Sequence, residues 1–249
     1  MRTFHQKPMQ TKIKFIFFGS SQFSKYVLNA LRERGFEPLL NITSAHEPLP
    51  ELPDADVYIV ASFGKILPDD VIYKPKFKTL NVHPSLLPKL RGPAPIQGTI
   101  LSGEKAGVSI MRLNDKMDEG PLLAQREVNL PKDAKYSLAE EILGKAGGEL
   151  LAEVLPKWVN GEIEEAPQEG PATYTQMIEK SDSDITNDSP EEALRKIRAY
   201  EVWPRARQGS LIITDAHIAD GELVIDKVIP AGKKEMDYTS YLNGLKGKQ

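Results

Sequence analysis

Three residues of the sequence carry an amide, an imidazole and a carboxylate in a pattern that suits acyl transfer. Asn81 and His83 stand two residues apart in the strand-like segment 79–83. Because side chains alternate along a strand, the two are expected on the same face of a sheet. Asp118 follows in the turn-like segment 117–120. An amide can stabilise an oxyanion, an imidazole can exchange a proton near neutral pH and a carboxylate can orient the imidazole, so these groups suffice for one acyl transfer.

Each of these residues also has a purely structural interpretation. A single histidine in a strand is commonly a hydrogen-bonded core residue, and Asp118 lies beside Asp115 and Glu119, as an exposed turn acid would. A functional role is favoured by position, because His83 ends a strand before a Pro-rich loop and Asp118 follows another strand. Open α/β sheets bind ligands beyond the carboxyl ends of their strands, so we expect a crevice with His83 on one side and Asp118 on the other.

The surrounding sequence alternates strand-like and helix-like segments, which predicts an α/β domain with a mainly parallel sheet. The longest predicted helix is expected to begin with a capping box between Ser137 and Glu140. Its inner face is expected to consist of Leu138, Ile142, Leu150, Leu151, Val154 and Leu155. Strands are predicted at 12–18, 38–42, 56–61, 79–83, 108–113 and 122–128, and helices at 22–34, 96–101 and 137–159.

A second, smaller unit is predicted after a change of composition near residue 161. Asn187 to Pro190 supply a capping residue and an early proline, which favours a helix that runs to about Tyr200. Short strands are predicted at 211–214, 217–219 and 222–228, with a turn at 220–221. The predicted organisation is an extension at 1–11, a first domain at 12–166, a linker at 167–188 and a small C-terminal domain at 189–249.

Composition restricts the classes of function. The chain has 249 residues, of which 40% are apolar, enough for one domain and a smaller one. It contains no cysteine, which excludes disulfides and thiol nucleophiles and fits a reducing cytoplasm. Apolar runs are too short to cross a bilayer, and residues 1–12 lack the apolar core of a secretory signal, so we expect a cytoplasmic protein without a membrane partner. A net charge of −3 means that any RNA contact must be local.

One further segment invites a functional interpretation of lesser weight. Gly19, Ser20 and Ser21 form a sharp turn from strand to helix, and a helix N-terminus can receive an anion. The second and third glycines of the dinucleotide-binding pattern are missing, which argues against a nucleotide site there.

Several segments resemble the methionyl-tRNA formyltransferase family, within the larger group of enzymes that use 10-formyltetrahydrofolate. The pair Asn81 and His83 with a downstream Asp118 is shared by the whole group. The pattern Ser-Leu-Leu-Pro-x-x-Arg-Gly-x-Ala-Pro-Ile-Gln at 85–97 and the pattern Pro-Ala-Gly-Lys-Lys at 230–234 resemble the tRNA-directed branch. The resemblance covers most of the chain, at residues 17–23, 61–68, 81–97, 108–123 and 230–234.

The resemblance implies a Rossmann-like formyltransferase domain followed by a small, abbreviated OB-like β domain, acting as a monomer. It implies formyl transfer from 10-formyltetrahydrofolate to the amino group of initiator methionyl-tRNA, without a metal. Asn81 and His83 would donate to the oxyanion, and Asp118 would orient His83 and help to remove the amine proton. Folate contacts are implied for Ser85, Leu86, Leu87, Pro88, Phe63, Gly64, Ile66, Leu67, Pro68 and Asp115.

The expected RNA contacts differ from the family pattern. In the family a basic loop follows the second strand, whereas residues 43–53 contain neither Lys nor Arg. The C-terminal domain is also short. We therefore expect phosphate contacts from local cations, and two alternatives stay open: a formyltransferase for a small amine, such as an amino sugar nucleotide or glycinamide ribonucleotide, or a folate-binding protein without turnover. The candidate tRNA-binding cations are Lys89, Arg91, Lys233 and Lys234.

Overall fold

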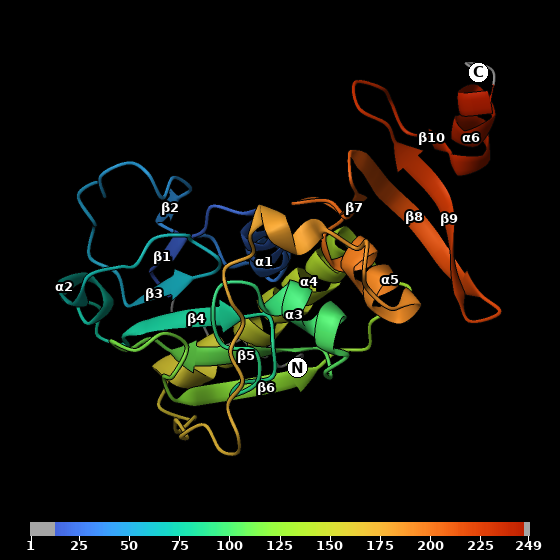
Figure 1. Cartoon of the computed structure of the whole chain (residues 1–249). Coiled ribbons are helices and arrows are strands. Elements are labelled where there is room, and N and C mark those ends of the chain that lie inside the picture. The colour runs from blue at the N-terminus through green and yellow to red at the C-terminus, as the bar shows by residue number, and fades with distance from the viewer. Residues whose placement is uncertain (1–12, 247–249) are drawn as a thin grey trace, which may run out of the picture.

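The computed structural model describes residues 13–246, which form a six-stranded and a four-stranded sheet (Figure 1). The predicted extension at 1–11 lies outside the described residues. The elements are, in order, β1 (Phe15–Phe18), α1 (Gln22–Glu33), β2 (Leu40–Ile42), β3 (Val57–Val60), α2 (Asp69–Ile72), β4 (Thr79–His83), α3 (Pro95–Ser102), β5 (Gly107–Arg112), β6 (Leu122–Glu127), α4 (Tyr136–Val159), the 3-10 helix η1 (Lys180–Ser183), α5 (Pro190–Ala199), β7 (Arg207–Gln208), β8 (Leu211–Ala219), β9 (Glu222–Ile229), β10 (Met236–Asp237) and α6 (Tyr238–Lys246).

The larger sheet confirms the predicted α/β architecture. Its strand order is β2-β1-β3-β4-β5-β6, and the first four strands pair in parallel. β5 runs antiparallel to β4, and β6 runs antiparallel to β5, so five of the six strands point the same way. β1, β3 and β4 are buried along their whole length, which explains why β1 and β3 read as continuous apolar runs. Among the described residues, no helix has the length and apolar character that crossing a membrane requires.

The two faces of this sheet separate core from site. Phe15 and Phe17 pack with α1 and α4 in the main core, whereas Ile16 and Phe18 pack on the opposite face. In β4 the main core receives the side chains of residues 80 and 82. By alternation, the side chains of Asn81 and His83 leave β4 on the other face, as predicted.

The predicted inner face of the longest helix is partly wrong. Leu138 is 43% exposed, and α4 turns a stripe of small residues toward α1 and the sheet instead. A Cβ added to Gly147 would lie 2.6 Å from Val82, and one added to Gly148 would lie 2.5 Å from the Val27 carbonyl oxygen. Glycine thus lets α4 approach both neighbours closely, a role that a search for large apolar side chains does not detect.

The predicted capping box at the start of this helix is also wrong. The N-cap of α4 is Lys135, without a side-chain cap. Glu140 points inward, where one carboxylate oxygen accepts hydrogen bonds from the Phe23 amide and the Tyr136 hydroxyl, each at 3.1 Å. Burial raises the pKa of Glu140 above its ordinary value, and the bonds from Tyr136 and Phe23 only partly oppose this shift.

The smaller unit is built around α5, whose first turn is closed by a capping box between Ser189 and Glu192, in agreement with the predicted helix. The predicted turn at 220–221 joins β8 to β9. The two short strands predicted before it are one strand, β8, interrupted by irregular pairing near Asp215. α6 was not predicted from the sequence. The core of this unit consists of Ile185, Ala193, Leu194, Ile197, Ala206, Ile213, Ala216 and Val228.

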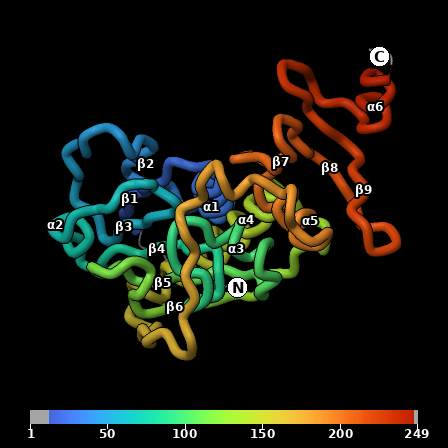
Figure 2. The backbone as a smooth tube through the Cα atoms, viewed as in Figure 1, coloured from blue at the N-terminus to red at the C-terminus, as the bar shows by residue number. Residues whose placement is uncertain are grey.

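The segment predicted as a linker is attached to the larger unit. Figure 2 shows the chain after α4 passing across the larger sheet before it enters α5. Ala166 pairs with Leu122, and Tyr174 forms a parallel bridge with Arg91. The domain boundaries remain a proposal, but this segment is not a free connection between two bodies.

Glu140 generates a prediction about stability and pH. A carboxyl group whose pKa is raised by folding stabilises the fold fully below its unfolded pKa, and this contribution is lost as the pH rises through the folded pKa. Glu140→Gln keeps an oxygen for Phe23 and Tyr136 but carries no charge. We expect the variant to gain stability relative to the parent as the pH rises from about 4 to about 8, measured by urea unfolding. The control is Glu141→Gln, which removes the neighbouring carboxylate that forms an ion pair with Lys145 on the surface. Parallel pH profiles for Glu140→Gln and its parent would contradict the assignment.

Candidate active site

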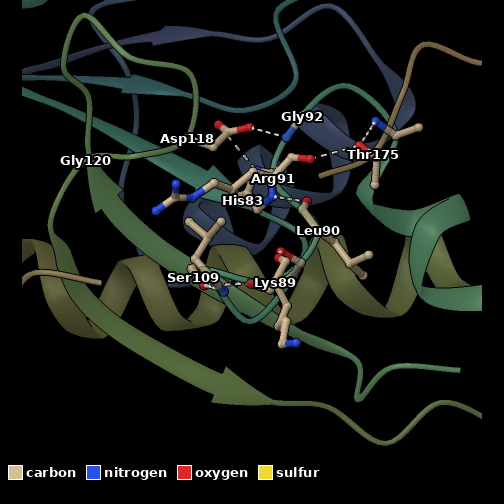
Figure 3. Close-up of polar contacts among 12 residues, drawn as sticks. His83, Lys89, Leu90, Arg91, Gly92, Ser109, Asp118, Gly120 and Thr175 are labelled. Carbon is tan, nitrogen blue, oxygen red and sulfur yellow. Dashed lines mark hydrogen bonds and ion pairs between the residues drawn. The ribbon is translucent and has the colours of Figure 1, made fainter. Parts of the chain in front are cut away.

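His83 and Asp118 meet on the face of the larger sheet (Figure 3). The His83 Nδ1 atom lies 3.6 Å from an Asp118 carboxylate oxygen, and Nε2 lies 3.1 Å from the Leu90 carbonyl oxygen. A carbonyl oxygen only accepts, so a hydrogen bond there requires a proton on Nε2. The side chains of His83 and Asp118 are 5% and 13% exposed. The two groups therefore form a pair that is largely shielded from water.

Asp118 reaches this position by a different route from the one predicted. Because β5 runs antiparallel to β4, Arg112 pairs with Leu80 near the start of β4. The loop that follows β5 therefore leaves near the amino end of β4 and folds back toward His83. It does not extend from the edge of the sheet at which the parallel strands end. The Asp118 carboxylate then accepts a hydrogen bond from the Gly92 amide at 2.8 Å.

The backbone around Asp118 leaves little space. Asp118 itself has a φ of +53°, in the left-handed region. A Cβ on Gly120 would overlap the Arg112 carbonyl oxygen. Only glycine allows the chain to turn this closely against β5.

Asn81 completes the group of three. Its side chain lies on the same face of β4 as His83 and is 9% exposed. An amide at this place on the strand can donate an N–H group to a molecule bound beside His83, as an oxyanion donor would.

The predicted folate-binding stretch after His83 contains two buried residues. The Ser85 hydroxyl donates to the Lys89 carbonyl oxygen at 2.6 Å, and the Leu87 amide donates to the Ser109 hydroxyl at 3.1 Å. Ser109 in turn donates to the Ser85 carbonyl oxygen. Ser85 and Leu87 shape the loop from within, whereas Leu86 and Pro88 are partly exposed.

The second predicted folate-binding loop follows β3. Phe63 and Leu67 are buried in the core on the site's face of the sheet. Gly64, Pro68 and, in the loop after β5, Asp115 are exposed. Ile66 is 85% exposed, an unusual environment for a large apolar side chain.

The four candidate cations lie in unlike surroundings. Lys233 and Lys234 are exposed in the turn between β9 and β10. Lys89 is partly exposed, with its amino group 3.7 Å from Glu104. Arg91 is buried, and its guanidinium donates to Gln168 and Tyr174, so the prediction that it meets an RNA phosphate is not supported by its surroundings.

Sequence reasoning missed the polar side chains that hold the site loops. Ser109 and Gln125 support the loop after His83, and Gln168 and Thr175 hold Arg91 and its neighbours. Gln168 and Thr175 lie in a Pro- and Gly-rich stretch whose composition indicates only a surface segment. No cluster of three or more His, Asp or Glu side chains suited to a metal ion occurs in residues 13–246.

The close fit at Gly120 generates a prediction. Gly120→Ala places a methyl group against the Arg112 carbonyl oxygen, so we expect a loss of about 1–3 kcal/mol in unfolding free energy, measured by urea denaturation. The control is Gly244→Ala in α6, where a Cβ meets open space and a neutral or slightly stabilising effect is expected. Equal stability of Gly120→Ala and the parent chain would show that this turn has room that the structure does not indicate.

Comparison with known proteins identifies the family. A family model described as formyl transferase matches residues 28–155. A methionyl-tRNA formyltransferase of Sulfurihydrogenibium sp. is 41% identical over 189 residues, with 72% of this chain and 61% of the relative covered. A methionyl-tRNA formyltransferase of Enterococcus faecalis is 30% identical over 300 residues, with 93% and 96% covered.

One solved structure adds a likeness in fold. HypX of Aquifex aeolicus in complex with tetrahydrofolic acid has a TM-score of 0.69 at 19% identity and covers 93% of this chain and 47% of its own. This chain spans about three fifths of the length of its Sulfurihydrogenibium relative, but nearly all of the Enterococcus one. The matched family model and these relatives show that the chain belongs to the formyl transferase family.

Proposed function

We propose that this chain transfers a formyl group from 10-formyltetrahydrofolate to the amino group of methionyl-tRNA. The observation that carries the proposal is the shielded pair of His83 and Asp118, 3.6 Å apart, on the face that also presents the Asn81 amide. The names of the curated relatives support the acceptor, and the tetrahydrofolic acid in HypX supports a folate donor on this fold. Such an enzyme would work in the cytoplasm, where translation begins; a monomer stays a prediction.

The three groups have distinct tasks in the proposed reaction. As the acceptor amine attacks the formyl carbon, Asn81 and His83 donate to the oxygen that becomes negative, a kind of contact worth about 3–4 kcal/mol for one donor. Asp118 holds the imidazole and takes part in removing the amine proton through water. The tetrahedral intermediate then collapses, the carbon–nitrogen bond to the folate breaks and tetrahydrofolate leaves with a proton.

The folate would lie between two loops. The loop 63–68 offers backbone groups and the exposed side chain of Ile66. The loop after β5 offers the backbone of residues 115–118. Such a mixture of apolar surface and main-chain hydrogen bonds suits a flat pterin ring. Ser85, Leu86, Leu87 and Pro88 would form the remaining wall.

The roles of His83 and Asp118 can be tested by separating turnover from binding. We expect His83→Ala and Asp118→Ala each to lower turnover by about 100-fold or more, because general acid–base groups act on the transition state. Folate affinity, measured by titration, should change little. Asp133→Asn, an exposed aspartate before α4, is the matched control. Near-normal turnover in either site variant would refute the assignment, and folate binding by a parent without turnover would favour the non-catalytic alternative.

A small amine is the second candidate acceptor, favoured by one observation. The segment 43–53, between β2 and β3, contains neither Lys nor Arg, so it offers no cation to an RNA backbone. With Arg91 buried, Lys89, Lys233 and Lys234 are the remaining predicted phosphate contacts.

Reversing the charge of Lys233 and Lys234 separates the two acceptors. We expect Lys233→Glu with Lys234→Glu to raise the KM for charged tRNA and flatten its salt dependence, because fewer counterions are released. Activity on a small amine should be unaffected. The control is Lys145→Glu with Lys157→Glu, which makes the same change of net charge at two exposed positions of α4. Unchanged tRNA use across a salt series would show that the turn after β9 does not bind RNA.

A further inference from the structure

A segment outside the predicted site is bonded to Asp118 and to the loop residue Leu90, whose carbonyl oxygen faces His83. Residues 168–175, here named the clamp segment, follow the bridge at Ala166 and precede η1. The clamp segment contacts the loop after β4 and the loop after β5. Its side chains come from a stretch that sequence patterns classify only as a linker.

The side chain of Gln168 uses both ends of its amide. Its Nε2 donates to the carbonyl oxygens of Asp118 and Gly120, each at 2.8 Å. Its Oε1 accepts from Nε and Nη2 of Arg91, at 3.0 and 2.7 Å. One side chain therefore fixes the backbone that carries the carboxylate and the arginine that precedes Gly92.

The other half of the clamp holds the backbone next to His83. The Leu90 amide donates to the Thr173 hydroxyl at 2.9 Å, and the Arg91 amide donates to the Thr173 carbonyl oxygen at 2.9 Å. The Thr175 hydroxyl donates to the Arg91 carbonyl oxygen, a contact visible in Figure 3. Leu90 is also the residue whose carbonyl oxygen faces His83 Nε2. The clamp thus positions an acceptor on each side of the imidazole.

The buried guanidinium of Arg91 explains why an amide is suited to position 168. Arg91 also donates to the Tyr174 hydroxyl at 2.9 Å and lies 3.4 Å from Glu119. Gln168 satisfies two further N–H groups without adding charge beside Asp118. A glutamate could accept from Arg91 but could not donate to the carbonyl oxygens of Asp118 and Gly120.

We propose that Gln168 is a positioning residue for formyl transfer, which sets the distance between Asp118 and His83 through the backbone of the loop after β5 and the side chain of Arg91 in the loop after β4. The proposal rests on the proposed function. The His83–Asp118 separation of 3.6 Å exceeds an ordinary hydrogen bond, so small shifts of either loop decide whether the pair engages. Misplacement of reacting groups by about 1 Å can cost on the order of 100-fold in rate.

Two variants separate the acceptor and the donor of this amide. Gln168→Ala removes both groups. Gln168→Glu keeps an acceptor for Arg91 but loses the donor to the carbonyl oxygens of Asp118 and Gly120. We expect kcat to fall about 10- to 100-fold in each, with KM for folate and for the acceptor changed less than about threefold. Glu169→Ala, the exposed neighbour, should resemble the parent. A kcat equal to that of the parent in Gln168→Ala, or in a folded Gln168→Glu, would overturn the proposal. A loss of kcat that is fully explained by a lowered Tm would also overturn it.

A second readout needs no turnover. The His83 ring signals in NMR, recorded at one fixed pH, report the surroundings of the ring between Asp118 and the Leu90 carbonyl oxygen. We expect shifted His83 ring signals in Gln168→Ala and Gln168→Glu and the parent signals in Glu169→Ala. An inactive parent with this pattern would refute the proposed function but not the positioning role. Unchanged His83 ring signals in both Gln168 variants would refute the positioning role.

Discussion

The arrangement of the site depends on the alternation of side chains along β4. Leu80 and Val82 must enter the main core, where Gly147 allows α4 to pack directly on Val82. The intervening residues therefore leave the strand on the other face, where neither α1 nor α4 covers them. A shift of one residue in the pairing of β4 would bury the amide and imidazole among apolar side chains. The same burial that stabilises the sheet thus fixes the direction of Asn81 and His83.

The carboxylate is placed by the backbone of distant segments. The Gly92 amide binds the Asp118 carboxylate, and Gln168 holds the Asp118 carbonyl oxygen. Gly120 allows the loop to turn against β5. These contacts join the loop after β4, the loop after β5 and the chain after α4. Because each is a hydrogen bond to a main-chain group or a steric limit, the position of Asp118 follows from the path of the chain more than from its own side chain.

The clamp segment also changes how the two units relate. A Pro- and Gly-rich connection would normally let two domains move independently. Here the bridges at Ala166 and Tyr174 tie the connection to the larger unit, and a bridge between Asp184 and Arg207 ties its other end to the smaller sheet. The connection is therefore attached at one end beside the site and at the other end to the smaller sheet.

The sequence by itself determined the alternating elements, the shared face of Asn81 and His83, and the family, because these depend on periodicity and on local residue types. It did not determine the antiparallel entry of β5, the inward turn of Glu140 or the burial of Arg91. A charged residue reads the same in a sequence whether it faces water or a buried partner. The contact between Gln168 and Asp118 joins residues 50 positions apart. Only the tertiary structure decides such contacts, because they depend on how the elements pack and not on any local pattern.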